Sequence, residues 1–460
     1  MYLTNLKITG IKCFDELNID FPHTNNDYSG WVVILGGNGV GKSTLLQAIA
    51  LTLMGPISGQ RLVRPEGWIR EDADYGTIES SIIRGDHDSQ VGQPRKKPYE
   101  VKFAVIGKKE TQVDEETYDQ PQLVHRADHK ERNSLMSGPF GANRAGWFSC
   151  GYGPFRRLSG GESQSRSLPE REIRFLTLFS ESTALTQCED WLTNLYSRSI
   201  DEFNTNKERD KFDLTVIRRI IDLLLPVAVK IDHIDSRHVF FKNSGKTVVA
   251  IPDLSDGYRS FLALAIDLLR HITESGLNLQ ALVTTNAEEP RVEIDGVVLV
   301  DEIDSHLHPI WQRDIGFRLC KIFPRIQFIV TSHSPFVAQA ATSQGLFVLR
   351  SKELSGLVDA SQPVESVRGW RVDQILTSDL FGLTETRDAE TQQLLDRHSK
   401  LIQRRTWEKL SRQEQVELAE LEVRLSQRLT APGESLNERE KQIEMAQYVE
   451  KTLERLGSQP

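Results

Sequence analysis

A glycine-rich run with a lysine and a hydroxyl residue at its end is the segment best suited to chemistry. Residues 36–43 read Gly-Gly-Asn-Gly-Val-Gly-Lys-Ser, directly after the apolar run Trp31–Leu35 and before a helical pattern that starts at Leu45. Glycines let backbone N–H groups turn toward phosphate oxygens, while the lysine charge and the hydroxyl meet the terminal phosphates and Mg²⁺. The spacing predicts a nucleoside triphosphate site formed by Gly36, Gly37, Asn38, Gly39, Val40, Gly41, Lys42, Ser43 and Thr44.

A pair of acidic residues far downstream supplies the second half of the expected chemistry. The apolar, β-branched run 296–300 ends in Asp301-Glu302, which indicates a buried strand that delivers two carboxylates to one end. We expect Asp301 and Ser43 to hold Mg²⁺ and Glu302 to polarise the attacking water, because phosphoryl transfer depends on positioning and electrostatics. Another strand, 327–330, runs into Thr-Ser-His-Ser-Pro at 331–335.

These motifs resemble those of ABC-type ATPases of the SMC and RecF branch, in the subgroup whose acidic strand runs into an Asp-x-His-Leu-His-Pro segment, here residues 304–309. The resemblance implies an α/β, SMC/RecF-like P-loop ATPase head that uses ATP and Mg²⁺. It also implies a head-to-tail homodimer, in which each ATP lies between the phosphate loop of one copy and a signature motif of the other. By the same resemblance, Asp304 lies in the loop that crosses the dimer interface, and His333 senses the γ-phosphate.

Two segments compete for the signature motif. Leu158-Ser159-Gly160-Gly161-Glu162 matches the family consensus, but polar residues and Pro169 follow it. Leu254-Ser255-Asp256-Gly257-Tyr258 instead precedes a strongly periodic apolar series. A signature needs a helix N-terminus to meet a phosphate. We therefore predict that the nucleotide-contacting residues of the signature are Ser255, Asp256 and Gly257.

The family's Mg²⁺-contacting glutamine has no clear counterpart. The segment Trp147–Pro154 lies where this glutamine loop should leave its strand, yet it contains no glutamine. The sequence therefore supports nucleotide binding better than fast turnover.

Composition and the pattern of apolar residues along the chain suggest four regions. We expect a first ATPase lobe at 1–153, in which 118–145 are an irregular polar insertion, and a short helical insertion at 154–235, too short for a long coiled coil. A second ATPase lobe is expected at 236–383. The region 384–460, rich in Glu, Arg and Gln, predicts helices over 389–403, 411–429 and 437–456, for partner binding or oligomerisation.

Composition indicates a cytoplasmic protein. The 460 residues carry 38% apolar and 26% charged side chains, as soluble globular proteins do. Four cysteines without paired spacing argue against disulfides and zinc clusters. We expect no membrane association, since no apolar run approaches the roughly 20 residues that cross a bilayer.

A formal net charge of −9 argues against nucleic-acid binding by overall charge. DNA contact is expected only through local basic patches, for which the candidates are 95–97, 108–109 and the pair Arg156-Arg157, all expected on solvated loops. The sequence has no recognisable nuclease site.

Short, arm-less ATPases of this subgroup with a helical extension resemble the ATPase subunits of the bacterial anti-phage systems Septu and PARIS. The resemblance implies an ATP-hydrolysing regulatory subunit that controls a separate nuclease, of the His-Asn-His type in preference to the Toprim type. The alternative is a RecF-like DNA-repair ATPase that binds DNA. A neighbouring gene for a small nuclease would favour the first reading.

Overall fold

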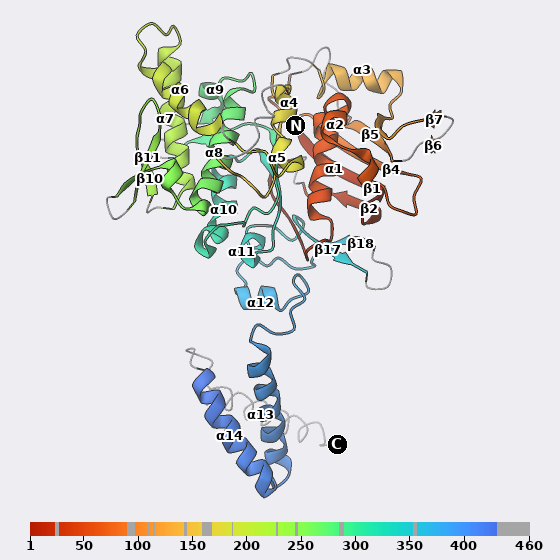
Figure 1. The fold of residues 1–460 in the computed structure, drawn as a ribbon, viewed down its shortest axis with the longest axis vertical. Helices are drawn as coiled ribbons and strands as arrows, with labels where there is room; N and C mark the ends of the chain where they lie inside the picture. Colours follow the sequence, from red (N-terminus) through yellow and green to blue (C-terminus); the bar gives the residue numbers. More distant parts are fainter. Residues whose placement is uncertain are drawn as a thin grey trace, which may run out of the picture. The chain divides into compact units, whose positions relative to one another are not determined.

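The computed structural model describes residues 1–23, 27–89, 97–107, 111–113, 116–141, 145–158, 168–185, 187–226, 229–243, 247–284, 289–352 and 357–429 (Figure 1). The chain forms two compact units. The first contains Met1–Ile375 and Asp379–Phe381, and the second contains Leu376–Ser378 and the residues from Gly382 onward.

A six-stranded sheet organises the first unit. Its order is β18-β17-β3-β16-β15-β9, and all neighbouring pairs are parallel except the edge pair β17 and β18. The carboxyl ends of the parallel strands therefore meet at one edge, where ligand sites of open α/β sheets form. The strands are β3 (Gly30–Gly36), β9 (Phe148–Tyr152), β15 (Gly296–Val300), β16 (Ile326–Thr331), β17 (Leu346–Ser351) and β18 (Val358–Ser361).

Both faces of this sheet are buried, and alternate residues of each strand serve different cores. In β3, Trp31, Val33 and Leu35 join one hydrophobic cluster, while Val32 and Ile34 join the other. Burial on both faces explains why the strands read as continuous apolar runs.

The face of the sheet that carries Val32 and Ile34 packs against α1 (Lys42–Met54) and an antiparallel sheet of order β2-β1-β4-β5-β8. Helix α1 contacts strands of both sheets, including β3, β15 and β16 on one side and β4 and β5 on the other. The helix that follows the phosphate loop is thus held between two sheets. The strands of the second sheet are β1 (Tyr2–Ile11), β2 (Phe14–Asp20), β4 (Tyr75–Ile83), β5 (Tyr99–Ile106) and β8 (Gln122–His125).

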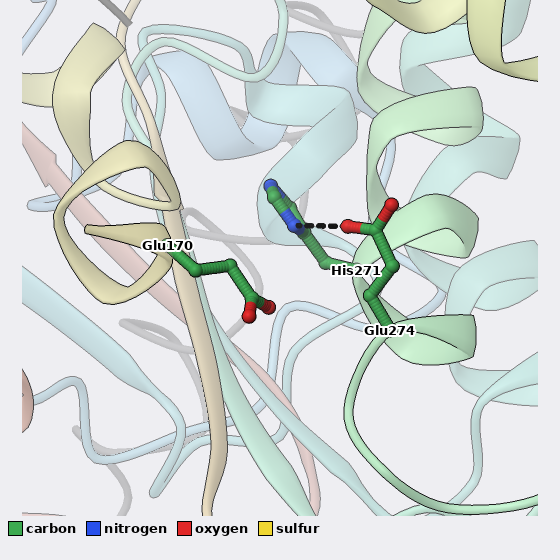
Figure 2. A group of neighbouring side chains, drawn as sticks. All are labelled: Glu170, His271 and Glu274. Atoms are coloured by element: carbon green, nitrogen blue, oxygen red, sulfur yellow. Dashed lines mark ion pairs between the residues drawn. The ribbon is translucent and has the colours of Figure 1, made fainter. Parts of the chain in front are cut away.

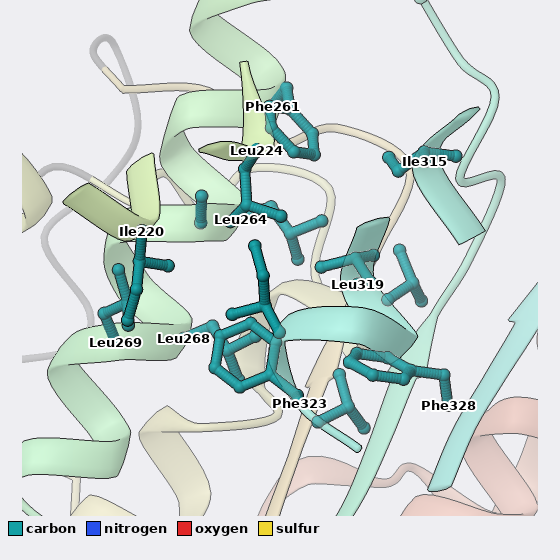
Figure 3. Packing of buried hydrophobic residues seen from close by; sticks show 14 of the residues in the cluster. Ile220, Leu224, Phe261, Leu264, Leu268, Leu269, Ile315, Leu319, Phe323 and Phe328 are labelled. Atoms are coloured by element: carbon teal, nitrogen blue, oxygen red, sulfur yellow. The ribbon is translucent and has the colours of Figure 1, made fainter. Parts of the chain in front are cut away.

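Helices cover the opposite face of the sheet, which carries Trp31, Val33 and Leu35. Leucine, isoleucine and phenylalanine side chains of α7, α8 and α10 interlock there and reach β16 through Phe328 (Figure 3). The helices are α6 (Gln187–Ile200), α7 (Lys207–Leu224), α8 (Asp256–Thr273) and α10 (Pro309–Ile322). A three-stranded sheet completes this side with β10 (Val229–Ile234), β11 (Val239–Asn243) and β12 (Val248–Ala250).

Shorter elements connect these layers. They are α2 (Pro56–Leu62), α3 (His129–Ser137), α4 (Glu170–Ile173), α5 (Leu176–Phe179), α9 (Leu279–Leu282), α11 (Pro335–Ala338), α12 (Val372–Leu376), β6 (Thr111–Val113), β7 (Glu116–Tyr118), β13 (Val283–Thr284) and β14 (Arg291–Val292). Among the described residues, no helix combines the length and apolarity that a bilayer crossing requires.

The predicted irregular insertion at 118–145 is wrong where the structure describes it. Strand β8 extends the antiparallel sheet, and α3 begins at a capping box in which Asp128 and Glu131 bond each other's backbone N–H groups.

The second unit contains a helical hairpin of α13 (Ala389–Trp407) and α14 (Arg412–Arg428). Ser411 and Glu414 form the predicted capping box. The leucine stripe of α14 is buried against α13 in two small clusters, formed by Leu401, Ile402, Leu410, Leu418 and Leu421 and by Leu395, Leu425 and Leu429. This stripe therefore has its partner within the hairpin. The helix predicted at 437–456 lies outside the described residues.

Candidate nucleotide site

The phosphate loop joins β3 to α1 through glycines that have other residues packed close to their Cα atoms. Gly39 and Gly41 adopt left-handed backbone conformations with φ of 77° and 89°. A Cβ on Gly41 would lie 2.4 Å from the Cys13 Sγ, and one on Gly36 would lie 2.7 Å from the Leu349 carbonyl oxygen. Larger residues would push the loop out of shape, which explains the glycines. The face that remains open to solvent contains Gly37, Asn38, Gly39 and Ser43.

Lys42 curls back over this loop. Its Nζ donates hydrogen bonds to the carbonyl oxygens of Gly36 (2.9 Å) and Gly37 (2.8 Å), and the residue is only 7% exposed. Burial lowers the pKa of Lys42, while the charges of Asp301, Glu302 and Asp304 oppose that shift. The phosphate loop and the acidic segment therefore lie close enough for their charges to interact.

Thr331 clamps the acidic pair. Its hydroxyl donates to Asp301 Oδ1 and accepts the backbone N–H of Glu302 at 2.7 Å, and the residue is fully buried. Strands β15 and β16 are parallel neighbours, so the end of one strand fixes the end of the other. Glu302 itself has a left-handed backbone with φ of 45°, a conformation uncommon for a non-glycine residue and typical of functional sites.

Arg156 lies beneath the acidic pair, so the prediction of a solvated loop is wrong for this residue, while Arg157 is exposed as predicted. It is 3% exposed, and its guanidinium donates to the carbonyl oxygens of Gly153 (3.0 Å), Asp301 (2.9 Å) and Glu302 (3.1 Å). Burial lowers its pKa to about 10 against the opposing effect of the nearby acids. Arg156 is therefore an internal brace of the site and offers no surface charge to DNA.

Gln312 links the loop after the acidic pair to the loop after β16. Its Nε2 donates to the carbonyl oxygens of Asp304 (3.2 Å) and Leu307 (2.8 Å), and its Oε1 accepts the hydroxyl of Ser334 at 2.8 Å. Ser334 caps α11, directly after the exposed His333. The two loops predicted to sense ATP and to face a second copy are thus held by one amide. Asp304 Oδ1 is buried without a hydrogen-bond partner among the described residues.

The preferred signature segment heads α8, as predicted. Ser255 occupies the N-cap position without a side-chain capping bond, and Asp256 pairs with Arg259. A Cβ on Gly257 would lie 2.4 Å from the carbonyl oxygen of His306, so the glycine lets the helix start pack against the loop that carries Asp304. The competing segment at 158–162 falls outside the described residues after Leu158.

The donors fit the expected cofactor. Ser43 and Asp301 offer a hydroxyl and a carboxylate, the hard oxygen ligands that Mg²⁺ prefers in phosphate sites. Three contributors were missed from the sequence: Arg156, Thr331 and Gln312. Thr331 could have been found from its position at the end of a strand beside the acidic one. Arg156 lies just beyond the strand whose expected glutamine is missing.

Comparisons with known proteins show what this chain is similar to. A family model described as "AAA domain, putative AbiEii toxin, Type IV TA system" matches residues 143–338. The chain is 26% identical to "Septu protein PtuA" of Bacillus mycoides (strain KBAB4) over 87% of this chain and 47% of that protein. It is 23% identical to "Retron Vc95 probable ATPase" of Vibrio cholerae serotype O1 biovar El Tor over 75% of this chain and 73% of that protein.

Among solved structures, the SMC head domain from Thermotoga maritima is 17% identical, with a TM-score of 0.42, 79% of this chain covered and 99% of that chain. The chain spans about half the length of the Septu protein, 47%. The α/β fold class predicted from the motifs and the resemblance to Septu proteins are confirmed. The resemblance to PARIS stays a prediction.

Proposed function

We propose that this chain is an ATP-binding and ATP-hydrolysing regulatory subunit of an anti-phage defence complex, acting on a separate nuclease through head-to-tail dimers with ATP between the copies. The observation that carries the ATPase part is the Asp301–Glu302 pair, clamped by Thr331 and lying in the electrostatic field of Lys42. The similarity to Septu and retron ATPases supports the defence setting.

Each residue has a defined task in this proposal. The amides of the phosphate loop and Lys42 bind the phosphates, which replace the two loop carbonyls that Lys42 now contacts. Ser43 and Asp301 hold Mg²⁺, which when bound neutralises charge on the phosphate oxygens. Glu302 orients a water for attack and accepts its proton, and His333 contacts the γ-phosphate.

The dimer part rests on the start of α8. Its first amides receive no bond from the Ser255 side chain, so they can bind an anion, and the helix dipole favours one there. In the dimer, Ser255, Asp256 and Gly257 of one copy close over ATP bound by the other. The contact of Gly257 with the loop that carries Asp304 would let both segments face the second copy together.

The nuclease partner is proposed to be of the His-Asn-His type in preference to the Toprim type. DNA binding by the ATPase itself is the RecF-like alternative, and it would rely on local basic patches. Burial of Arg156 leaves Arg157 as the exposed arginine of one candidate patch. Co-purification with the product of a neighbouring gene, compared with DNA binding by the isolated chain, separates the two readings.

Two substitutions test the ATPase proposal. Lys42→Ala removes the positive charge aimed at the phosphates, so isothermal titration should detect no ATP binding. Glu302→Gln should bind ATP normally. Its hydrolysis rate should fall by about a hundredfold or more, because the variant loses the general base. Arg64→Ala, an exposed residue outside the site, serves as the control. Unchanged ATP affinity in the first variant, or normal turnover in the second, would refute the assigned roles.

A further inference from the structure

Three potential metal ligands meet at the carboxyl-terminal end of α8, away from the nucleotide site. Glu170 comes from α4, and His271 and Glu274 come from the end of α8 (Figure 2). One donor atom from each residue lies within 4.8 Å of the other two. Helix α8 has 18 residues and is about 27 Å long, so this cluster is far from Ser255 at its other end.

The imidazole of His271 is oriented by a buried carboxylate. Its Nε2 lies 3.1 Å from Asp267 Oδ2, and the Arg270 guanidinium holds the other oxygen at 2.9 Å. When Asp267 accepts the Nε2–H, the ring carries its lone pair on the other nitrogen, Nδ1.

That free nitrogen has no hydrogen-bond partner. His271 is 1% exposed, and its Nδ1 is buried without a hydrogen bond among the described residues. Its nearest charged neighbour is Glu274 Oε2 at 3.9 Å, beyond hydrogen-bonding distance. A buried acceptor without a hydrogen bond destabilises the folded protein, and a ligand bound to this nitrogen would remove that destabilisation.

We propose that Glu170, His271 and Glu274 bind a divalent transition metal, Zn²⁺ in the first instance. One imidazole nitrogen with two carboxylate oxygens is a Zn²⁺-type donor set, and three protein ligands leave a position for water. A carboxylate behind the ligating histidine is the usual outer-shell arrangement of such sites. The end of a helix also carries negative partial charge, which favours a cation.

The charges around the cluster set the conditions for binding. Arg174 pairs with Glu170, so the metal must compete with this guanidinium for one carboxylate, while Arg270 is occupied by Asp267. The metal would tie the start of α4 to the end of α8 and act as a structural clip, separate from Mg²⁺ at the phosphates.

Direct Zn²⁺ titration of the full chain tests the site. The nucleotide-free protein should take up one Zn²⁺ in competition with a chromophoric chelator, and its melting temperature should rise with Zn²⁺. Glu170→Gln and Glu274→Gln should each weaken Zn²⁺ binding by about tenfold or more, because each removes a charged ligand. Glu181→Gln, an exposed glutamate just after α5, should bind as the parent protein does.

His271→Gln completes the test because it can keep the bond to Asp267 while it lacks the Nδ1 lone pair. It should fold, by circular dichroism, and lose the Zn²⁺-dependent rise in melting temperature. Equal Zn²⁺ binding by the parent and both glutamine variants would overturn the proposal. Absence of any Zn²⁺ effect on the parent would do so too.

Discussion

At the scale of single residues, Thr331 is the junction of the candidate site. One hydroxyl satisfies both the carboxylate of Asp301 and the N–H of Glu302. Both groups are buried beside charged neighbours. The threonine therefore determines which oxygen of Asp301 remains available to a cation, and it fixes the backbone position from which the Glu302 side chain extends. Precision of this kind determines phosphoryl-transfer rates.

Thr331→Val should therefore impair both stability and hydrolysis. The change keeps the shape but leaves an acceptor and a donor unpaired, so the free energy of unfolding should fall by about 1–3 kcal/mol. Thr331→Ser keeps the hydroxyl and loses one methyl group, and should cost about 1 kcal/mol. Urea denaturation and steady-state ATPase assays measure both effects. An unchanged Thr331→Val variant beside an impaired Thr331→Ser variant would show that the methyl group matters and the hydroxyl does not.

Sequence patterns predicted the residues that chemistry requires and missed those that support them. The phosphate loop and the acidic pair follow fixed spacings, because phosphates and Mg²⁺ impose them. Arg156 follows no such spacing. Its role depends on a strand, β9, being placed beside β15, and a basic pair in a polar stretch has the same appearance on a surface loop.

At the scale of elements, α8 connects the proposed dimer contact to the core. Its start faces the Asp304 loop, and its apolar side packs between α7 and α10 (Figure 3). A rigid, buried helix can present its first turn with little freedom. This is the physical reason for preferring Ser255 to Ser159 as the signature serine.

Ser255→Arg should block ATP-dependent dimerisation in the Glu302→Gln background, because the long cation fills the space next to the helix start. Ser159→Arg is the matched control and should dimerise normally. Light scattering with and without ATP distinguishes them. The reverse ranking would assign the signature to residues 158–162.

Mixing variants tests whether the two motifs act in trans. Lys42→Ala and Ser255→Arg should each be inactive alone. In a head-to-tail mixed dimer, both changes fall in one site and the other site is intact. Hydrolysis should therefore reappear on mixing. If the mixture stays inactive, the motifs do not combine across two copies as proposed.

Elements were predictable where burial shapes the sequence. The strand at 296–300 is predicted with its observed bounds, because a strand buried on both faces reads as a continuous apolar run. Helix α3 was missed because it is short and mostly exposed, with Leu135 as its one fully buried side chain. Its capping box was the available signal. Strand β10 was missed because polar residues interrupt it, and tertiary pairing with β11 decides its conformation.

At the scale of the whole molecule, the division into two units separates ATP chemistry from proposed assembly. All the predicted site residues lie in the first unit. In the second, α14 buries Leu418, Leu421 and Leu425 but exposes Val416 and Val423, seven residues apart on the same face. This exposed pair is the better candidate for partner contact than the leucine stripe.

Deleting residues 384–460 should leave ATP affinity unchanged and abolish association with the nuclease or collapse the higher assembly. Val416→Glu with Val423→Glu should reproduce the loss without unfolding the hairpin, because both side chains are exposed. Glu420→Gln, exposed on the same helix, is the control. Co-purification and ATP titration give the readout. A truncated chain that still assembles would place the contact elsewhere.

The left-handed backbone of Glu302 links catalysis to global stability. This backbone conformation lowers the free energy of unfolding by about 1–3 kcal/mol when the residue is a glutamate, whereas glycine adopts it without strain. Glu302→Gly should therefore abolish hydrolysis and yet unfold at a higher temperature than Glu302→Gln. Selection for stability alone would remove this glutamate, so its persistence in a lineage would itself report a need for turnover.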